Sequence, residues 1–122
     1  MDEIDATSLR EVQEKLLADA RDAHAHRAAA TVYGGREKQL RQTAMALLAG
    51  VELGEHDSPP EATLQVLTGR VRLNGQGRDW ELVTGDLITI PPERHSVTAL
   101  EDSVFLLSVL RAPVVEGDRG RS

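Results

Sequence analysis

The sequence predicts a mainly β protein, a sandwich or barrel of short antiparallel strands preceded by one N-terminal α-helix. An apolar stripe with helical spacing occurs only near the N-terminus. After it, short apolar runs alternate with turn signals at intervals of roughly eight to twelve residues, a pattern typical of sandwiches and barrels. A chain of 122 residues with 40% hydrophobic side chains suits a single domain with a buried core.

The helix is expected within the segment TSLREVQEKLLADARDAHAH, which covers residues 7–26, and is expected to fray near His24 to Arg27. Ser8 and Glu11 have the spacing of a capping box at its start. The apolar stripe consists of Leu9, Val12, Leu16, Leu17 and Ala20. Because the other face is charged, this stripe must pack either against the same domain or against a second subunit.

The β region is expected to begin near Arg27. Strands are predicted in the segments AAATVYGG, LRQTAMALLAGVEL, ATLQVLTGRVRL, DWELVTGDLITIPP and HSVTALEDSVFLLSVLR. Gly69 bends or breaks the third segment, and the sequence NGQG forms the turn after it. We therefore divide the chain into an N-terminal helical segment (1–26), a β-barrel (27–112) and a flexible C-terminal tail (113–122).

Charge and composition exclude several classes of partner and site. The net charge of −6 disfavours nucleic acids and anionic membranes, which both require a basic face. The absence of cysteine excludes disulfides and thiolate ligands. No apolar run approaches the roughly 20 residues of a membrane span, and the acidic N-terminus lacks the order of a signal peptide. We expect a cytoplasmic protein.

Two motifs resemble those of the cupin superfamily, whose members are RmlC-like double-stranded β-helix (jelly-roll) barrels. The first cupin motif, G-x5-H-x-H-x3-4-E-x6-G, matches here at Gly50, His56 and Gly69. The second, G-x5-P-x-G-x2-H-x3-N, matches at Gly85 and Pro91, and His95 follows one residue early. The resemblance covers about residues 27–110 and implies a cupin barrel and a homodimer.

The departures from these motifs concern the metal ligands. A typical cupin holds a divalent metal with three histidines and one glutamate. In this sequence Ser58 replaces the second histidine of the first motif, and Ala62 replaces the glutamate. In the second motif, Glu93 replaces the usual glycine and Ala99 replaces the final asparagine.

Two interpretations of the remaining histidines stay open. In the first, His56 and His95 hold a divalent metal (Fe, Mn, Ni, Cu or Zn) with help from Glu61 or Asp57. Such a site would be weak, because a catalytic metal needs about three protein ligands. In the second, no metal binds, and both imidazoles are neutral and hydrogen-bonded at the mouth of the barrel.

Other polar residues are candidates for ligand contacts. Gln65 interrupts an apolar strand, and Arg41 has the planar fork that pairs with a carboxylate. His24 and His26 have the spacing of a ligand pair only if their segment is extended, because residues i and i+2 do not share a helix face.

Three functions are consistent with these observations. The first is a binding module that holds a small molecule through His56, His95, Gln65 and Arg41. The second is an enzyme: the resemblance implies metal-dependent dioxygenases, isomerases or decarboxylases, and His95 could also act as a metal-free acid–base group. The third is a dimeric structural or regulatory barrel without chemistry.

Overall fold

The computed structural model describes residues 4–56 and 59–111, with Glu55 and His56 described in their backbone only. These ranges contain one helix and nine strands. The elements are α1 (Leu9–Asp22), β1 (Arg27–Tyr33), β2 (Leu40–Leu47), β3 (Glu52–His56), β4 (Glu61–Thr68), β5 (Arg70–Asn74), β6 (Asp79–Val83), β7 (Leu87–Thr89), β8 (His95–Ala99) and β9 (Ser103–Leu110). The predicted fold class, mainly β with one N-terminal helix, is confirmed.

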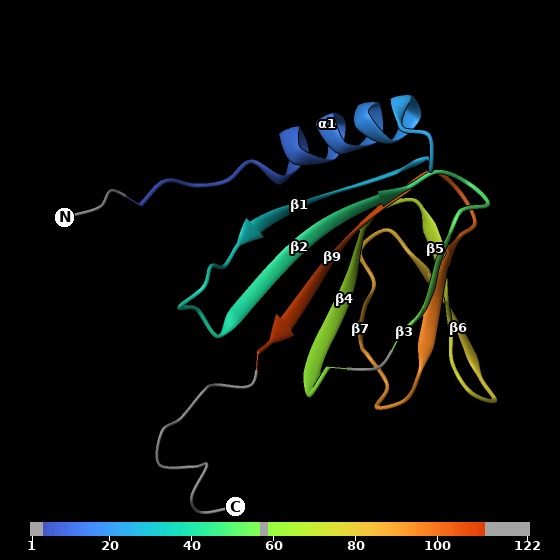
Figure 1. The fold of residues 1–122 in the computed structure, drawn as a ribbon. Helices are drawn as coiled ribbons and strands as arrows, with labels where there is room; N and C mark the ends of the chain where they lie inside the picture. Colours follow the sequence, from blue (N-terminus) through green and yellow to red (C-terminus); the bar gives the residue numbers. More distant parts are fainter. Residues whose placement is uncertain (1–3, 57–58, 112–122) are drawn as a thin grey trace, which may run out of the picture.

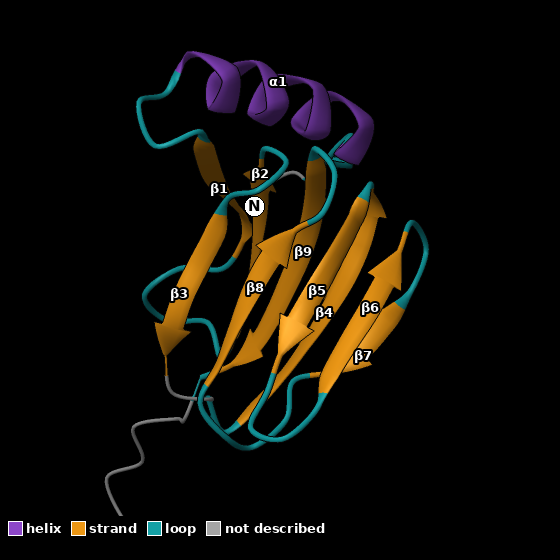
Figure 2. Cartoon of the chain, turned by 90° about the vertical axis from the view of Figure 1, so that its right-hand side faces the viewer, coloured by secondary structure: helices purple, strands orange, loops and turns teal. Residues whose placement is uncertain are grey.

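The strands form two sheets that face each other (Figure 1). The larger has the order β1-β2-β9-β4-β7, and the smaller has the order β3-β8-β5-β6. Their strand pairs are antiparallel, and the chain changes sheet repeatedly, as in a jelly roll. Figure 2 shows the smaller sheet in front of the larger one. No helix in the described ranges is long and apolar enough to cross a membrane.

The space between the sheets is filled by an aliphatic core. On β4, the inward positions Ala62, Leu64 and Val66 are buried and alternate with more exposed residues, as a pleated strand requires. The buried members of this inner core are Leu47, Ala62, Leu64, Val66, Val71, Leu73, Leu82, Ile90, Val97, Ala99 and Phe105. Phe105 is the largest side chain that is almost fully buried.

A second core lies between α1 and the outer face of the larger sheet (Figure 1). Leu16 and Ala20 of the helix are 3% and 0% exposed. They pack against the small side chains of Ala44 and Ala46 and against strand β9. The apolar stripe of the helix is therefore covered by its own barrel, which decides between the two alternatives that the sequence left open.

The helix begins as the capping box predicts and ends earlier than the segment 7–26. The Ser8 side chain accepts a hydrogen bond from the Glu11 backbone N–H at 3.2 Å. After Asp22 the backbone becomes extended at Ala23. His26 has a φ of 57°, in the left-handed region, and the chain then enters β1. The expected tail, 113–122, lies outside the described residues.

Gly69 forms the crossing from β4 in the larger sheet to β5 in the smaller sheet. Its φ of 95° lies in the left-handed region. The Gly69 N–H donates to Thr84 Oγ1 at 3.0 Å, and the Arg70 N–H donates to Ser103 Oγ at 2.9 Å. Ser103 is fully buried at the start of β9. The crossing is thus hydrogen-bonded to the turn between β6 and β7, through Thr84, and to the start of β9, through Ser103.

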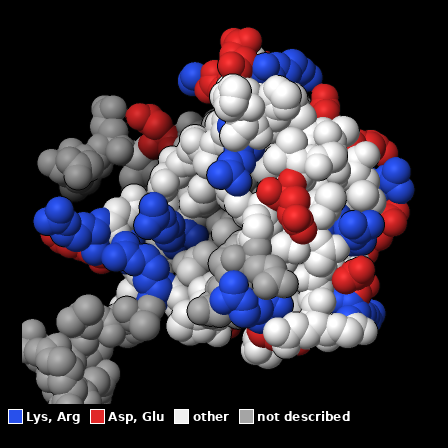
Figure 3. All heavy atoms as spheres, turned by 45° about the vertical axis from the view of Figure 1, so that its right-hand side comes forward, with Lys and Arg blue, Asp and Glu red and all other residues white. Residues whose placement is uncertain are grey.

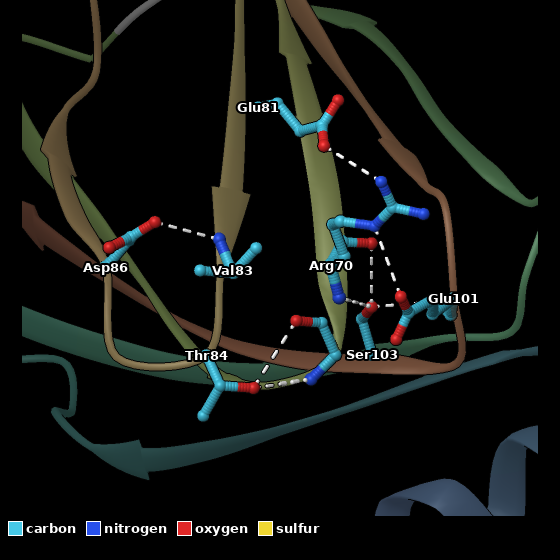
Figure 4. Close-up of polar contacts among 8 residues, drawn as sticks. Arg70, Glu81, Val83, Thr84, Asp86, Glu101 and Ser103 are labelled. Carbon is cyan, nitrogen blue, oxygen red and sulfur yellow. Dashed lines mark hydrogen bonds and ion pairs between the residues drawn. The ribbon is translucent and has the colours of Figure 1, made fainter.

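The Arg70 side chain forms an exposed ion-pair cluster beside this crossing (Figure 4). It contacts Glu81 at 2.9 Å and Glu101 at 3.2 Å. The hydrogen bond and charge of Glu81, and then those of Glu101, raise the pKa of Arg70. Because these side chains are solvent-exposed, we expect the cluster to add little stability.

We predict that Gly69→Ala destabilises the protein much more than Gly77→Ala. Both glycines have positive φ, at 95° and 86°. A Cβ at Gly69 would lie 2.5 Å from the Asp102 carbonyl oxygen, whereas a Cβ at Gly77 would meet no atom within 4 Å. Gly77→Ala should therefore cost about 1–2 kcal/mol from backbone strain alone, and Gly69→Ala at least about 2 kcal/mol more from overpacking. Urea unfolding measures both, and equal losses would contradict this account of the crossing.

We also predict that the helix contributes to the stability of the barrel. Leu16→Ala should lower the free energy of unfolding by about 2–5 kcal/mol, because it opens a cavity against the larger sheet. Leu87→Ala is the matched control: Leu87 is 63% exposed, so its truncation should change stability by less than about 0.5 kcal/mol. If both variants unfold at the wild-type urea concentration, the helix does not stabilise the barrel.

Candidate functional site at the open end of the barrel

His95 is a buried polar side chain in the aliphatic interior of the barrel. It is the first residue of β8 and is 3% exposed. Val97 and Ala99 alternate with it on the same face of the strand and belong to the inner core. The strand alternation therefore turns the imidazole toward the inside of the barrel.

A hydrogen bond sets the proton position on the His95 ring. Nδ1 lies 2.9 Å from the carbonyl oxygen of Glu93. A carbonyl oxygen only accepts, so Nδ1–H is the donor. In the neutral imidazole the lone pair is then on Nε2. This hydrogen bond holds the ring in one orientation and, when the ring is neutral, in one tautomer.

The backbones of the two motif histidines are paired. Strand β3 pairs with β8, and the Cα register places His56 opposite His95. The register shifts between Leu53 and His56, which indicates a β-bulge just before this pair. The side chain of His56, and Asp57 and Ser58 entirely, lie outside the described residues.

The inner side chains of β2 and β9 become more exposed toward this end of the barrel. Along β9, burial decreases from Phe105, at 1% exposure, to the half-buried Leu107 and Val109. Along β2 it decreases from the fully buried Leu47 to the half-buried Met45. Leu53 of β3 is half-buried as well and is paired with the β8 residue Val97. These side chains all pack against the inner core. We call Met45, Leu53, Leu107 and Val109, together with His95, the open-end site.

The open-end site lies away from α1. In Figures 1 and 2 the helix crosses one end of the molecule, and the end of β3 and the end of β9 point toward the other. Because β8 is antiparallel to β3, its first residue, His95, lies at this second end as well.

The described residues do not fit the metal centre that a typical cupin contains. No group of three or more His, Asp or Glu side chains that could hold a metal occurs in residues 4–54 and 59–111. Ala62 stands at the motif position of the glutamate and is 4% exposed in the inner core. Its methyl side chain has no atom that can coordinate a metal. Glu61 is exposed and precedes Ala62 on β4, so strand alternation places it on the other face.

Of the two remaining predicted site residues, Gln65 lies on the outer face of the larger sheet, and Arg41 is the register partner of Val109 of the open-end site. Gln65 alternates with the buried Leu64 and Val66, so it belongs to the outer face of the larger sheet. Arg41 is exposed on β2 and lines a pocket with Arg36 and Arg111.

His24 and His26 are also separate from the open-end site. Both are exposed in the connection between α1 and β1. Their side chains therefore take no part in the barrel interior.

Sequence reasoning missed Arg36 and Arg111 as companions of Arg41. Arg36 lies in the connection between β1 and β2, and Arg111 directly follows β9. Nothing in the local sequence links the three, because their proximity arises only when β2 pairs with β9.

Comparison with known proteins identifies the fold. No protein-family model matches the sequence, and no curated protein matches it. A conserved protein of unknown function from Streptococcus pyogenes superposes with a TM-score of 0.69 at 19% identity, covering 93% of both chains. The matched part of this chain is longer than the barrel and the C-terminal tail together. The match therefore extends into the N-terminal segment.

Two further structures match a smaller part of the chain. An RmlC-like cupin protein from Desulfovibrio desulfuricans has a TM-score of 0.61 at 22% identity, over 69% of this chain and 81% of the other. The cupin domain of Cnp3 from Schizosaccharomyces pombe has a TM-score of 0.62 at 12% identity, over 77% and 71%. At these identities the likeness concerns architecture only. The chain has the RmlC-like cupin fold, as the two sequence motifs predicted.

Proposed function

We propose that this protein binds a small molecule at the open-end site, with His95 as the polar anchor. The observation that carries the proposal is the buried His95 imidazole, fixed by its hydrogen bond to the Glu93 carbonyl at 2.9 Å and placed among aliphatic side chains. Ligand pockets commonly combine an apolar wall with a few placed polar groups.

The chemistry of the site favours a ligand that is mostly apolar and carries a hydrogen-bond donor. In this proposal a hydroxyl or N–H group of the ligand forms a hydrogen bond with the His95 imidazole. The half-buried Met45, Leu53, Leu107 and Val109 would cover its apolar part. His56, whose backbone is paired with that of His95, is the second anchor in this proposal.

The packing limits where the ligand can enter. Leu47, Val66 and Phe105 are almost fully buried in the inner core. Only the end at which β2 and β9 become half-buried offers partly accessible apolar surface on the inner face of these strands. This gradient supports a shallow site rather than a ligand enclosed in the barrel, and it disfavours a barrel without a binding role.

One observation favours a metal-dependent enzyme as a second candidate. Histidines that bind metals usually donate their other ring N–H to a carbonyl or carboxylate, as His95 donates to Glu93. Ala62 argues against a metal-dependent enzyme, because this buried side chain cannot coordinate a metal. A homodimer and a cytoplasmic location remain predictions.

The first test is a fragment screen on the full chain by ligand-observed NMR. We expect fragments with a hydroxyl or N–H group on an apolar ring to bind wild type and His24→Ala equally. His24 is an exposed histidine outside the barrel and serves as the matched control. His95→Ala and the more conservative His95→Gln should weaken binding about tenfold, corresponding to one hydrogen bond of about 1–1.5 kcal/mol.

Circular dichroism must show that the His95 variants keep the β fold. If folded His95→Ala and His95→Gln bind the same fragments with wild-type affinity, His95 is not the anchor. If wild type binds none of the fragments, the proposed function itself is wrong.

The second test measures metal content by elemental mass spectrometry. The protein is purified without an affinity tag that binds metals and compared with the His56→Ala, His95→Ala double variant. We expect much less than one metal per chain in both, because a strong site needs about three ligands. Near-stoichiometric Fe, Mn, Ni, Cu or Zn that disappears in the double variant would favour the enzyme instead.

A further inference from the structure

A basic pocket lies beside the hairpin that joins β1 to β2, and the proposed function does not use it. Its volume is about 480 Å³, and its lining is mostly polar or basic. The lining residues are Thr31, Gly34, Gly35, Arg36, Arg41 and Arg111. Three of these six carry a guanidinium group. We call this set the arginine pocket.

The backbone of the hairpin holds the pocket in shape. Gly34 has a φ of 126°, and a Cβ there would lie 3.1 Å from Cα of Arg41, so only glycine lets the hairpin approach so closely. Arg111 ties the end of β9 to the same hairpin. Its Nη1 donates to the carbonyl of Gly35 at 2.7 Å, and its backbone N–H donates to the carbonyl of Gln39 at 2.7 Å.

The charge of the pocket is not neutralised by the described part of the chain. Within residues 4–54 and 59–111, the carboxylates form ion pairs with Arg10, Lys15, Arg21 and Arg70, and none pairs with the three arginines of the pocket. Figure 3 shows basic side chains gathered on the side where the β1–β2 hairpin lies, whereas both signs are mixed over the rest of that face. This excess of positive charge occurs in a chain whose net charge is −6.

We propose that the arginine pocket binds the oxyanion group, a carboxylate or a phosphate, of a small soluble molecule. Guanidinium groups form paired hydrogen bonds with planar or tetrahedral oxyanions, and an anion relieves the mutual repulsion of the three cations. The Thr31 hydroxyl lines the same cavity and supplies a neutral donor. A large polyanion is disfavoured, because the remainder of this acidic chain would repel it. This inference is independent of ligand binding at the open-end site.

The test is a calorimetric titration of the full chain with citrate and, separately, with inorganic phosphate at low ionic strength. Wild type should bind at least one of them saturably at one site, and added NaCl should weaken the binding. The double variant Arg36→Gln, Arg41→Gln should bind at least about tenfold more weakly. Arg111 is left unchanged, because its side chain also supports the hairpin.

The matched control is Arg10→Gln, Arg78→Gln, which removes two exposed guanidinium groups outside the pocket lining and gives the same net charge. It should keep the wild-type affinity within about twofold. Thermal unfolding checks that both variants fold. Binding of citrate alone assigns a carboxylate, and binding of phosphate alone assigns a phosphate.

Two results would overturn the inference: no saturable binding by wild type, or equal weakening in the pocket variant and the control. The latter would mean that general charge, not the pocket, attracts the anion. His95→Ala should leave oxyanion binding unchanged, so failure here and failure of the proposed function can be distinguished.

Discussion

The larger sheet is apolar on both faces, and the rest of the molecule is arranged to cover them. On β2, Leu47 faces the inner core, while Ala44 and Ala46 face outward and are also fully buried. The smaller sheet covers the inner face and α1 covers the outer one. Leaving either face in water would expose several aliphatic side chains at a cost of about 25 cal/mol per Å². The helix is therefore part of the folded unit, and its small alanine partners permit close contact.

The two ends of the barrel differ in their side chains. At one end lies the buried Ser103, whose hydroxyl accepts a hydrogen bond from the Arg70 N–H at the crossing. Toward the opposite end, the inner residues of β2 and β9 become accessible, and His95 introduces a polar group there. Arg41 and Val109 are register partners, so the arginine pocket borders the same end.

Much of the fold and part of the site followed from the sequence. The capping pair Ser8 and Glu11, the glycine crossing and the two histidines with motif spacing are local signals, and the structure places His56 opposite His95. The helix ends at Asp22, two residues before His24, near which it was expected to fray, because the backbone is already extended at Ala23. The outward position of Gln65 follows from the alternation of Leu64 and Val66, which strand parity already implied. The arginine pocket was not predictable, because it depends on the long-range pairing of β2 with β9.

The central claim is that the open-end site binds a small molecule, and amide shift mapping of the ¹⁵N-labelled chain tests it most directly. A fragment that binds in the screen is titrated into the labelled protein, and the changes in amide chemical shift are mapped onto the structure. The account predicts that the largest shifts occur at His95 and at the half-buried strand residues Met45, Leu53 and Val109, with little change at the buried Leu47 or along α1. Shifts concentrated on α1 or the outer face of the larger sheet, with none at His95, would contradict the account.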